Sequence, residues 1–322
     1  MIRLPARPVF STQRGLTLIE LMIAMLLGLI VVGGVLGIFV ANNETHRHTD
    51  DLARIQENAR VAVEIMGRSM REAGGNPCGI PPGAGLILRT AETHTGAQTT
   101  NWWSGGNDFN SVFIGYAGGT DFPANGSVPM VADSDAIITV SANTYVKTVI
   151  DDASEVMTLH GIEGLATGDI LFACSTDEGR GVVFIAGEVS GSSVSHTPFN
   201  GAVENLTTLG RINAEGWFVG KNARKGTSLF RASNGNNGQP EEIAPDVSAM
   251  RITYLLPNAD DYVGAGDIHS AKWPNVIAAY IELTLSRNTG NQKTINRTVG
   301  LTVNLRNRFN FSEGAPNGGD PP

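Results

Sequence analysis

The sequence predicts an α+β protein in which one long N-terminal helix precedes a large β-rich domain. An uncharged apolar run fills Leu21–Ala41, and an amphipathic helical pattern follows it as far as residue 75. Beyond that point, apolar and polar side chains alternate with period two, most clearly over Val276–Arg287 and Thr294–Arg306. We therefore expect a helix that is apolar in its first half and packs with its second half on a large antiparallel sheet.

Residues 1–15 are interpreted as a short leader, and residues 16–41 as a transmembrane helix. The leader carries three basic residues and no acidic one: Arg3, Arg7 and Arg14. The 21 uncharged residues that end at Ala41 extend about 31 Å as a helix, which is close to the thickness of a bilayer core. The positive-inside rule places the leader in the cytoplasm and the bulk of the chain in the periplasm.

Glu20 is the unusual residue of this segment. It lies inside the apolar stretch, because Leu16, Leu18 and Ile19 precede it. A carboxylate at that depth costs on the order of 2.5–3.5 kcal/mol unless a cation pairs with it. We therefore interpret Glu20 as a functional residue that requires a positively charged partner.

Residues 42–75 are predicted to continue the helix with one apolar stripe. The stripe residues recur at spacings of three and four: Leu52, Ile55, Ala59, Ala62, Met66, Met70 and Ala73. Gly74, Gly75 and Pro77 are typical helix-terminating residues. The stripe is expected to lie on the sheet.

Residues 76–311 are predicted to form the β-rich globular domain, and residues 312–322 a Gly/Pro-rich disordered tail. The last two strands should form a hairpin across Asn288–Gln292 with one face buried. The other predicted strands are Gly85–Arg89, Ser111–Tyr116, Ala136–Val140, Tyr145–Ile150, Ile170–Cys174, Gly181–Val189, Leu229–Arg231 and Ala249–Leu255.

The chain contains two cysteines, Cys78 and Cys174. In an oxidising compartment such a pair suggests one disulfide, which would tie the segment after the helix to a later strand. Closing a loop of this length contributes around 4 kcal/mol in the entropy model. Two buried free thiols are the alternative.

Composition and motifs argue against catalysis and against nucleic-acid binding. Without the leader, the chain carries 20 basic and 31 acidic residues and has no basic cluster. Nucleophile, zinc-protease and phosphate-loop motifs are missing, so we expect no enzyme and no cofactor. His46 and His48 near Asp50 and Asp51 suit a solvated helix face better than a metal site. The acidic loop around Asp260 does not have EF-hand spacing, so no metal is expected.

The N-terminus, Gly15-Leu16-Thr17-Leu18-Ile19-Glu20-Leu21 after a basic leader, resembles that of type IV pilins and type II secretion pseudopilins. The resemblance implies that a prepilin peptidase cuts after Gly15 and methylates the new amine of Leu16, where the family usually has phenylalanine. It also implies the partner of Glu20, namely the positively charged N-terminus of a neighbouring subunit in the membrane or filament. The architecture expected from the periodicity is the pilin architecture.

Further along, the chain resembles PilW-type minor pilins. The similar segments are Glu57–Arg60, Met70–Gly74, Cys78-Gly79, Gly168–Leu171 with Cys174, Ala249–Leu255 and Val303–Asn307. This implies a minor pilin that joins other minor pilins in an inner-membrane complex, primes assembly of a type IV pilus and then lies at its tip. The implied partners are the major pilin, the inner-membrane assembly platform and a tip adhesin. The implied roles are twitching, adhesion or DNA uptake, without direct nucleic-acid binding.

Two other interpretations remain open at this point. A GspJ-like minor pseudopilin of a type II secretion system shares this N-terminus and helix. A membrane-anchored periplasmic binding or adhesion module would keep its leader uncut.

Overall fold

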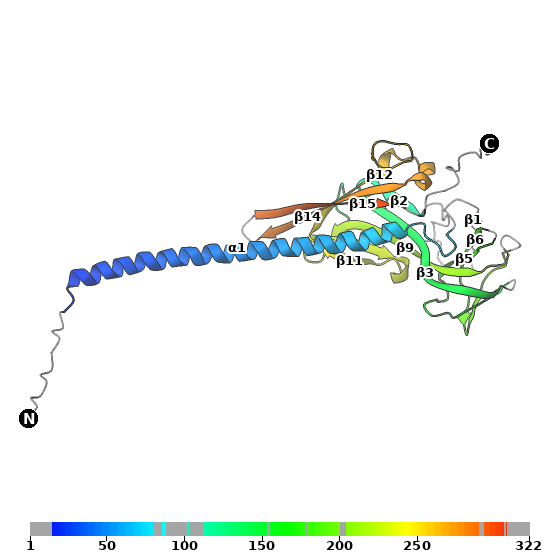
Figure 1. The fold of residues 1–322 in the computed structure, drawn as a ribbon, viewed down its shortest axis with the longest axis horizontal. Helices are drawn as coiled ribbons and strands as arrows, with labels where there is room; N and C mark the ends of the chain where they lie inside the picture. The colour runs from blue at the N-terminus through cyan, green and yellow to red at the C-terminus, as the bar shows by residue number, and fades with distance from the viewer. Residues whose placement is uncertain are drawn as a thin grey trace, which may run out of the picture. The chain divides into compact units, whose positions relative to one another are not determined.

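In a computed structural model of the chain, the structure describes residues 15–79, 86–87, 102, 112–152, 155–177, 179–199, 204–289, 293–305 and 307. The chain divides into two compact units, Met1–Ala53 and Arg54–Pro322. The expected α+β class is confirmed, because a long N-terminal apolar helix is followed by a large body of mainly antiparallel sheet (Figure 1). The predicted tail, residues 312–322, lies outside the described residues.

The long helix α1 (Leu18–Glu72) is a single element of 55 residues. It ends because Gly74 takes a left-handed φ of 75° and the Gly75 N–H donates to the Glu72 carbonyl oxygen at 2.8 Å. Glycine adopts this helix-terminating conformation without a Cβ penalty. Pro77, which has no N–H group to continue a helix, follows at once.

The predicted apolar stripe of α1 is the face that packs on the body. Its buried members are Ile55, Ala59, Ala62, Met66, Met70 and Ala73, while Leu52 is half-buried. They share one core with side chains from both sheets. Gly67 brings the helix close to the smaller sheet, since a Cβ there would lie 2.9 Å from Leu301 Cδ2.

The larger sheet has 11 strands among the described residues, in the order β1-β6-β5-β9-β3-β4-β8-β7, with β10 on β9, β11 on β10 and β2 on β3. Its pairs are antiparallel except β1–β6, which is parallel. The strands are β1 (Leu86–Ile87), β2 (Phe113–Tyr116), β3 (Ala136–Asp152), β4 (Val156–Leu159), β5 (Ile170–Ser175), β6 (Arg180–Ile185), β7 (Val189–Ser190), β8 (Ser193–Ser195), β9 (Thr208–Lys221), β10 (Thr227–Ser233) and β11 (Pro240–Pro245).

The smaller sheet has four strands in the order β13-β12-β14-β15. Its strands are β12 (Val247–Leu255), β13 (Val263–Gly264), β14 (Ala278–Thr289) and β15 (Lys293–Asn304). β14 and β15 pair antiparallel from Ala278↔Asn304 to Thr289↔Lys293, which confirms the predicted hairpin. Short 3₁₀ helices complete the body: η2 (Ala117–Gly119), η3 (Pro123–Asn125), η4 (Asn234–Asn236), η5 (Ala265–Asp267) and η6 (Ser270–Asn275).

Several strand boundaries differ from the sequence-based prediction. The two predicted strands at Ala136–Val140 and Tyr145–Ile150 are one strand, β3, which absorbs irregularities as β-bulges along its ladders with β9 and β4. The predicted strand Gly181–Val189 is divided, because β6 ends at Ile185 and Val189 belongs to β7. The 14-residue strand β9 was not predicted, although it lies between β5 and β3.

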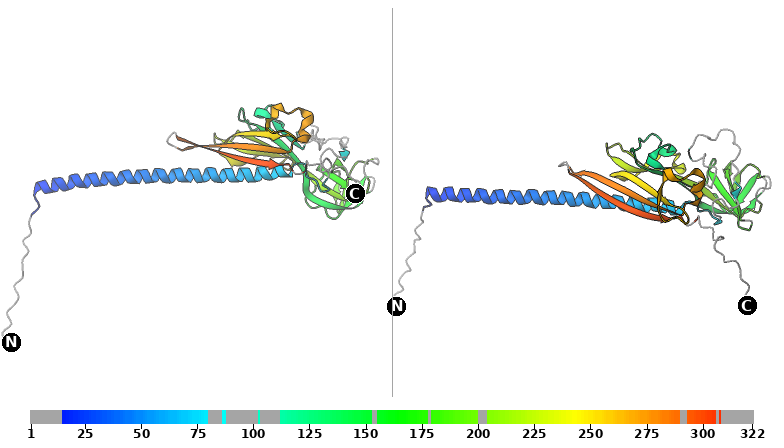
Figure 2. Two further views of the ribbon diagram at one scale, coloured as in Figure 1. Left: turned by 45° about the horizontal axis from the view of Figure 1, so that its top comes forward. Right: turned by 90° about the horizontal axis from the view of Figure 1, so that it is seen from above.

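Residues 143–211, which we call the inserted module, form a distinct part of the body. They comprise the second half of β3, β4 to β8 and the start of β9. In the sequence they lie between the first half of β3 and the second half of β9, which pair with each other at Ile137↔Trp217. A second hydrophobic core is built wholly from this module, with Met157, Leu171 and Phe184 among its buried residues. Figure 2 shows β3 running from the main part of the body into this module.

Three polar or covalent connections hold α1 and the strands of the body together. The Trp217 Nε1–H donates to Ser69 Oγ at 3.1 Å, and Ser69 Oγ lies 2.8 Å from Thr139 Oγ1, which joins the helix to β9 and β3. Cys78, just after the helix, forms a disulfide with Cys174 of β5, with a Cα–Cα distance of 6.3 Å. The two cysteines that the sequence offered are thus brought to bonding distance.

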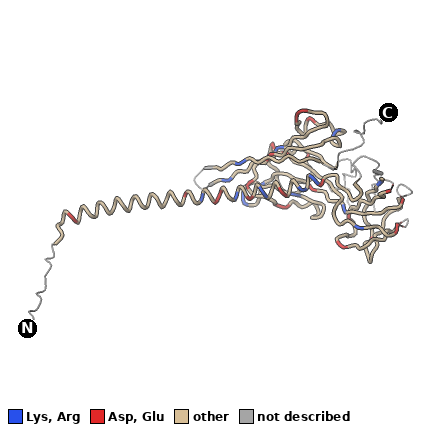
Figure 3. Tube along the Cα trace, in the orientation of Figure 1, with Lys and Arg blue, Asp and Glu red and all other residues tan. Residues whose placement is uncertain are grey.

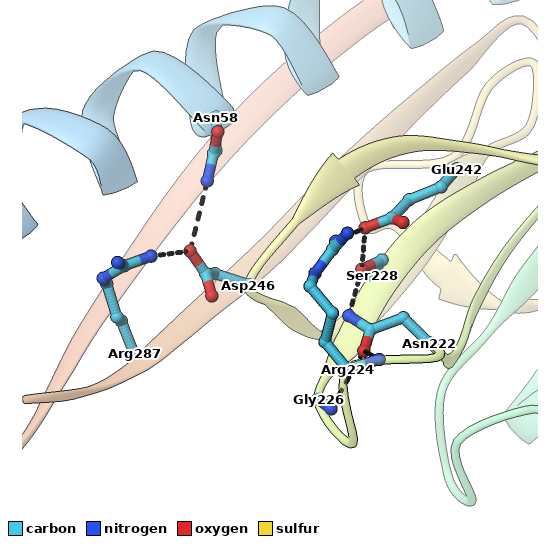
Figure 4. A network of polar contacts seen from close by, with 8 residues as sticks. All are labelled: Asn58, Asn222, Arg224, Gly226, Ser228, Glu242, Asp246 and Arg287. Atoms are coloured by element: carbon cyan, nitrogen blue, oxygen red, sulfur yellow. Dashed lines mark hydrogen bonds and ion pairs between the residues drawn. The ribbon is translucent and has the colours of Figure 1, made fainter.

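The third connection is centred on Asp246, in the turn between β11 and β12 (Figure 4). Its Oδ2 accepts hydrogen bonds from Asn58 Nδ2 of α1 at 3.2 Å and from Arg287 Nη1 of β14 at 2.9 Å. One turn carboxylate therefore fixes both the helix and the smaller sheet. Figure 4 also draws a second polar group, in the turn between β9 and β10 and on β10 and β11: Asn222, Arg224, Gly226, Ser228 and Glu242.

Candidate functional site

The candidate site is the beginning of α1, where Glu20 lies in the first helical turn. The Glu20 carboxylate folds back toward the chain start, and its Oε2 accepts from the Thr17 N–H at 3.0 Å and from the Thr17 hydroxyl at 2.9 Å. The Glu20 N–H in turn lies 3.4 Å from Thr17 Oγ1. This reciprocal arrangement is a capping box, in which two otherwise unpaired backbone N–H groups at a helix start gain acceptors.

The capping box also sets where the carboxylate points. Both hydrogen bonds fall on Oε2. The partial positive charge of a helix N-terminus favours an acidic side chain in the first turn. The capping box therefore holds the Glu20 carboxylate close to Thr17 at the start of the helix.

The sequence-based reasoning singled out Glu20 by its depth in the apolar run but missed its bond to Thr17. The bond could have been predicted from the sequence, because Thr17-x-x-Glu20 has the spacing of a capping box and an apolar run follows it. Gly15 and Leu16 precede the helix and are exposed. The peptide bond between them is thus accessible backbone outside regular structure.

The apolar half of α1 is exposed along its whole length in the single chain. Leu21 to Val40 include many large side chains that are 49% or more exposed. α1 is the one described helix that is long and apolar enough to cross a membrane, and Figure 3 shows its long stretch without charged side chains. A surface of this kind needs lipid or other apolar helices around it.

The remaining candidates from the sequence do not assemble into a metal site in the described residues. His46 and His48 lie on an exposed part of α1, and Asp260, Asp261 and Asp267 are exposed. Within the described residues, no group of three or more His, Cys, Asp or Glu side chains could hold a metal ion.

Comparison with known proteins bears on the same segment. Residues 10–36 match the family model of the prokaryotic N-terminal methylation motif. No curated protein and no solved structure matches the chain. The motif, the apolar helix and the antiparallel body support a type IV pilin-like protein or pseudopilin that is a substrate of prepilin peptidase, and they fit a membrane-anchored pilin.

Proposed function

We propose that this protein is a minor pilin of a type IV pilus, of the PilW type, without enzymatic activity. It is cut after Gly15 and methylated on the amine of Leu16 by prepilin peptidase, and it is held in the inner membrane by α1 with its body in the periplasm. With other minor pilins it primes assembly on the inner-membrane platform. It then lies at the tip of the pilus, next to the major pilin or a tip adhesin.

The observation that carries the proposal is the placement of Glu20. An acidic side chain is fixed at the start of α1, just before its exposed, uncharged stretch, and lies four residues after Leu16, the residue that follows the proposed cut. The capping box uses the backbone N–H of Thr17, which remains in the chain after a cut between Gly15 and Leu16. The geometry of the carboxylate is therefore compatible with the processed protein.

Processing creates the cation that Glu20 requires. The new α-amine of Leu16 is positively charged, and a neighbouring subunit brings the same group to the depth of Glu20 when helices align in the membrane. An unpaired carboxylate in the apolar layer costs on the order of 2.5–3.5 kcal/mol. Pairing with the neighbour's amine removes most of that cost and sets the axial position of one helix against the next.

The body supports a subunit role rather than an anchor alone. It packs on the second half of α1 through a continuous core. This body provides surfaces for lateral contacts with other subunits. Twitching, adhesion or DNA uptake would follow from the pilus rather than from chemistry in this chain.

The decisive experiment deletes the gene and measures sheared surface pili, twitching and secretion of an exported enzyme. Loss of pili and twitching with intact secretion, restored by the wild-type gene, supports the minor pilin. Normal pili with lost secretion assigns the chain to a GspJ-like pseudopilin. If neither changes and the leader stays on the mature protein, the chain is an anchored periplasmic module.

A further inference from the structure

Beyond α1, exposed large apolar side chains of the described residues concentrate in the inserted module. Tyr145, Val146, Ile150 and Val156 expose 50%, 47%, 60% and 42% of their surface. Elsewhere beyond α1, the described residues contain two such side chains, both tyrosines with a polar hydroxyl group. The Arg211 guanidinium covers one face of the Tyr145 ring at 4.6 Å, which leaves the three aliphatic side chains as the open surface.

Strand register places Val146, Ile150 and Val156, which we call the outer stripe, on the solvent face of β3 and β4. Val149 pairs with Leu159, and both are buried in the core of the inserted module. Neighbouring positions on a strand alternate between faces, so Val146 and Val156 point away from that core. Ile150 lies at the bulge between Val149 and Asp151, and its exposure shows that it also points outward.

The charges around the outer stripe are acidic. Asp151 and Glu155 are exposed beside Ile150 and Val156. Two basic side chains of the module are already paired with acidic ones: Lys147 lies 3.1 Å from Glu163 and is only 16% exposed, and Arg211, stacked on Tyr145, lies 3.6 Å from Asp169. The inserted module as a whole has nine acidic and three basic residues and so supplies −6 of the chain's net charge of −8.

We propose that the outer stripe is a docking surface for a different subunit of the same assembly, through an apolar patch flanked by Lys or Arg side chains. A second copy of this chain in a two-fold contact would bring Asp151 and Glu155 against the same acidic groups. Anionic lipid headgroups would be repelled for the same reason. Complementary charge across an interface chiefly sets partner choice and association rate.

This inference rests on the proposed function for the class of its partner, and the test separates the two. A photo-crosslinking residue replaces Ile150 in the full chain, expressed from its own locus in its own cells. The matched control is the same residue at Tyr280, which is 38% exposed on β14. A third position, Val35 of the apolar helix, reports assembly in the membrane irrespective of the body.

We expect Ile150 to give an adduct with another protein that carries a prepilin-type N-terminus, through a peptide rich in Lys or Arg, while Tyr280 gives at least fivefold less. Asp151→Lys with Glu155→Lys should lower the Ile150 adduct at least fivefold, and reversing the partner's basic residues should restore it. Self-adducts, lipid adducts or equal adducts at Ile150 and Tyr280 overturn the inference. Adducts at Val35 without an adduct at Ile150 overturn the docking inference and leave the proposed function standing. If neither Val35 nor Ile150 gives an adduct, the docking inference and the proposed function are both overturned.

Discussion

The phenol ring of Tyr254 occupies the space that a side chain at Gly115 would need. A Cβ atom at residue 115 would lie 2.5 Å from Tyr254 Cζ and still closer to its hydroxyl oxygen, with Trp273 Cη2 at 2.9 Å. Tyr254 is fully buried, and the Phe113 and Trp273 rings pack edge-on against it at 6.0 and 4.9 Å. β2 and β12 belong to different sheets, and they can pack together here because residue 115 has no side chain.

Gly115→Ala should lower the free energy of unfolding by about 1–3 kcal/mol, because overpacking forces the Tyr254 ring from its site. Tyr254→Phe should change it by less than about 1 kcal/mol, since the hydroxyl has no hydrogen-bond partner among the described residues. Combining the two should recover part of the loss. Urea unfolding of the full chain in detergent measures these values. Gly266→Ala is the matched control, because its nearest atom would be Ala117 Cβ at 3.9 Å; an equal loss there would contradict the packing argument.

Stability should fall at alkaline pH through the same tyrosine. Burial, with a smaller contribution from the Asp135 carboxylate, raises the pKa of Tyr254 well above its usual value of 10.0. Above pH 10 the unfolded chain therefore releases this proton while the folded chain retains it, so the free energy of unfolding decreases as pH rises. Urea midpoints between pH 8 and 11 should drop more steeply for the wild type than for Tyr254→Phe. Parallel curves would show that this group does not control the alkaline limit.

The two roles of Glu20, capping and pairing, can be separated by substitution. Glu20→Gln keeps an oxygen acceptor for the Thr17 N–H but removes the charge, so its incorporation into sheared pili should fall at least about tenfold, given 1.4 kcal/mol per factor of ten. Thr17→Val keeps the charge and loses a cap worth about 1 kcal/mol, so the loss should be about fivefold or less. Quantitative immunoblots of the pilus fraction provide the readout. Normal incorporation and piliation with Glu20→Gln or Glu20→Ala would refute the pairing.

Removing the disulfide should weaken the body measurably. Cys78→Ala with Cys174→Ala should lower the free energy of unfolding by about 2–5 kcal/mol, because the unfolded chain is no longer constrained by the crosslink. Urea unfolding of the oxidised wild type, the reduced wild type and the double variant compares the three states. Reduction should shift the wild type to the double variant's midpoint and leave the double variant unchanged; a midpoint insensitive to reduction would rule out a stabilising bond.

The elements that could be predicted from the sequence are those whose side-chain pattern is uninterrupted. The stripe of α1 and the β14–β15 hairpin follow one period over many residues, and both were predicted. β9 was missed because Gly210, Gly216 and Gly220 break its alternation. Those glycines are required by close packing: a Cβ at Gly216 would lie 2.5 Å from Ala124 Cβ, and one at Gly220 would lie 2.6 Å from Val128 Cγ1. The sequence of a central strand can thus resemble that of a loop, because close packing against its backbone requires glycine at several positions.

The candidate site shows a similar division. The position of Glu20 inside the apolar run can be read from the sequence alone, and so can the cleavage signal around Gly15. The direction of the carboxylate depends on its bond to Thr17, which is also local and could have been deduced from the spacing. The inserted module could not have been deduced from the sequence, because its core combines residues from six strands and no short pattern marks where it begins.

The bond between Cys78 and Cys174 also determines how the chain responds to a pulling force. The two cysteines are 96 positions apart in the sequence. The enclosed chain would have a contour length of roughly 330 Å at about 3.4 Å per extended residue. If α1 is pulled against the end of the chain, tension that reaches residue 78 passes straight to residue 174, and the enclosed length cannot be drawn out. The oxidised protein therefore has a much shorter maximum extension than the reduced one, and half of the inserted module is shielded from stretching by a single covalent bond.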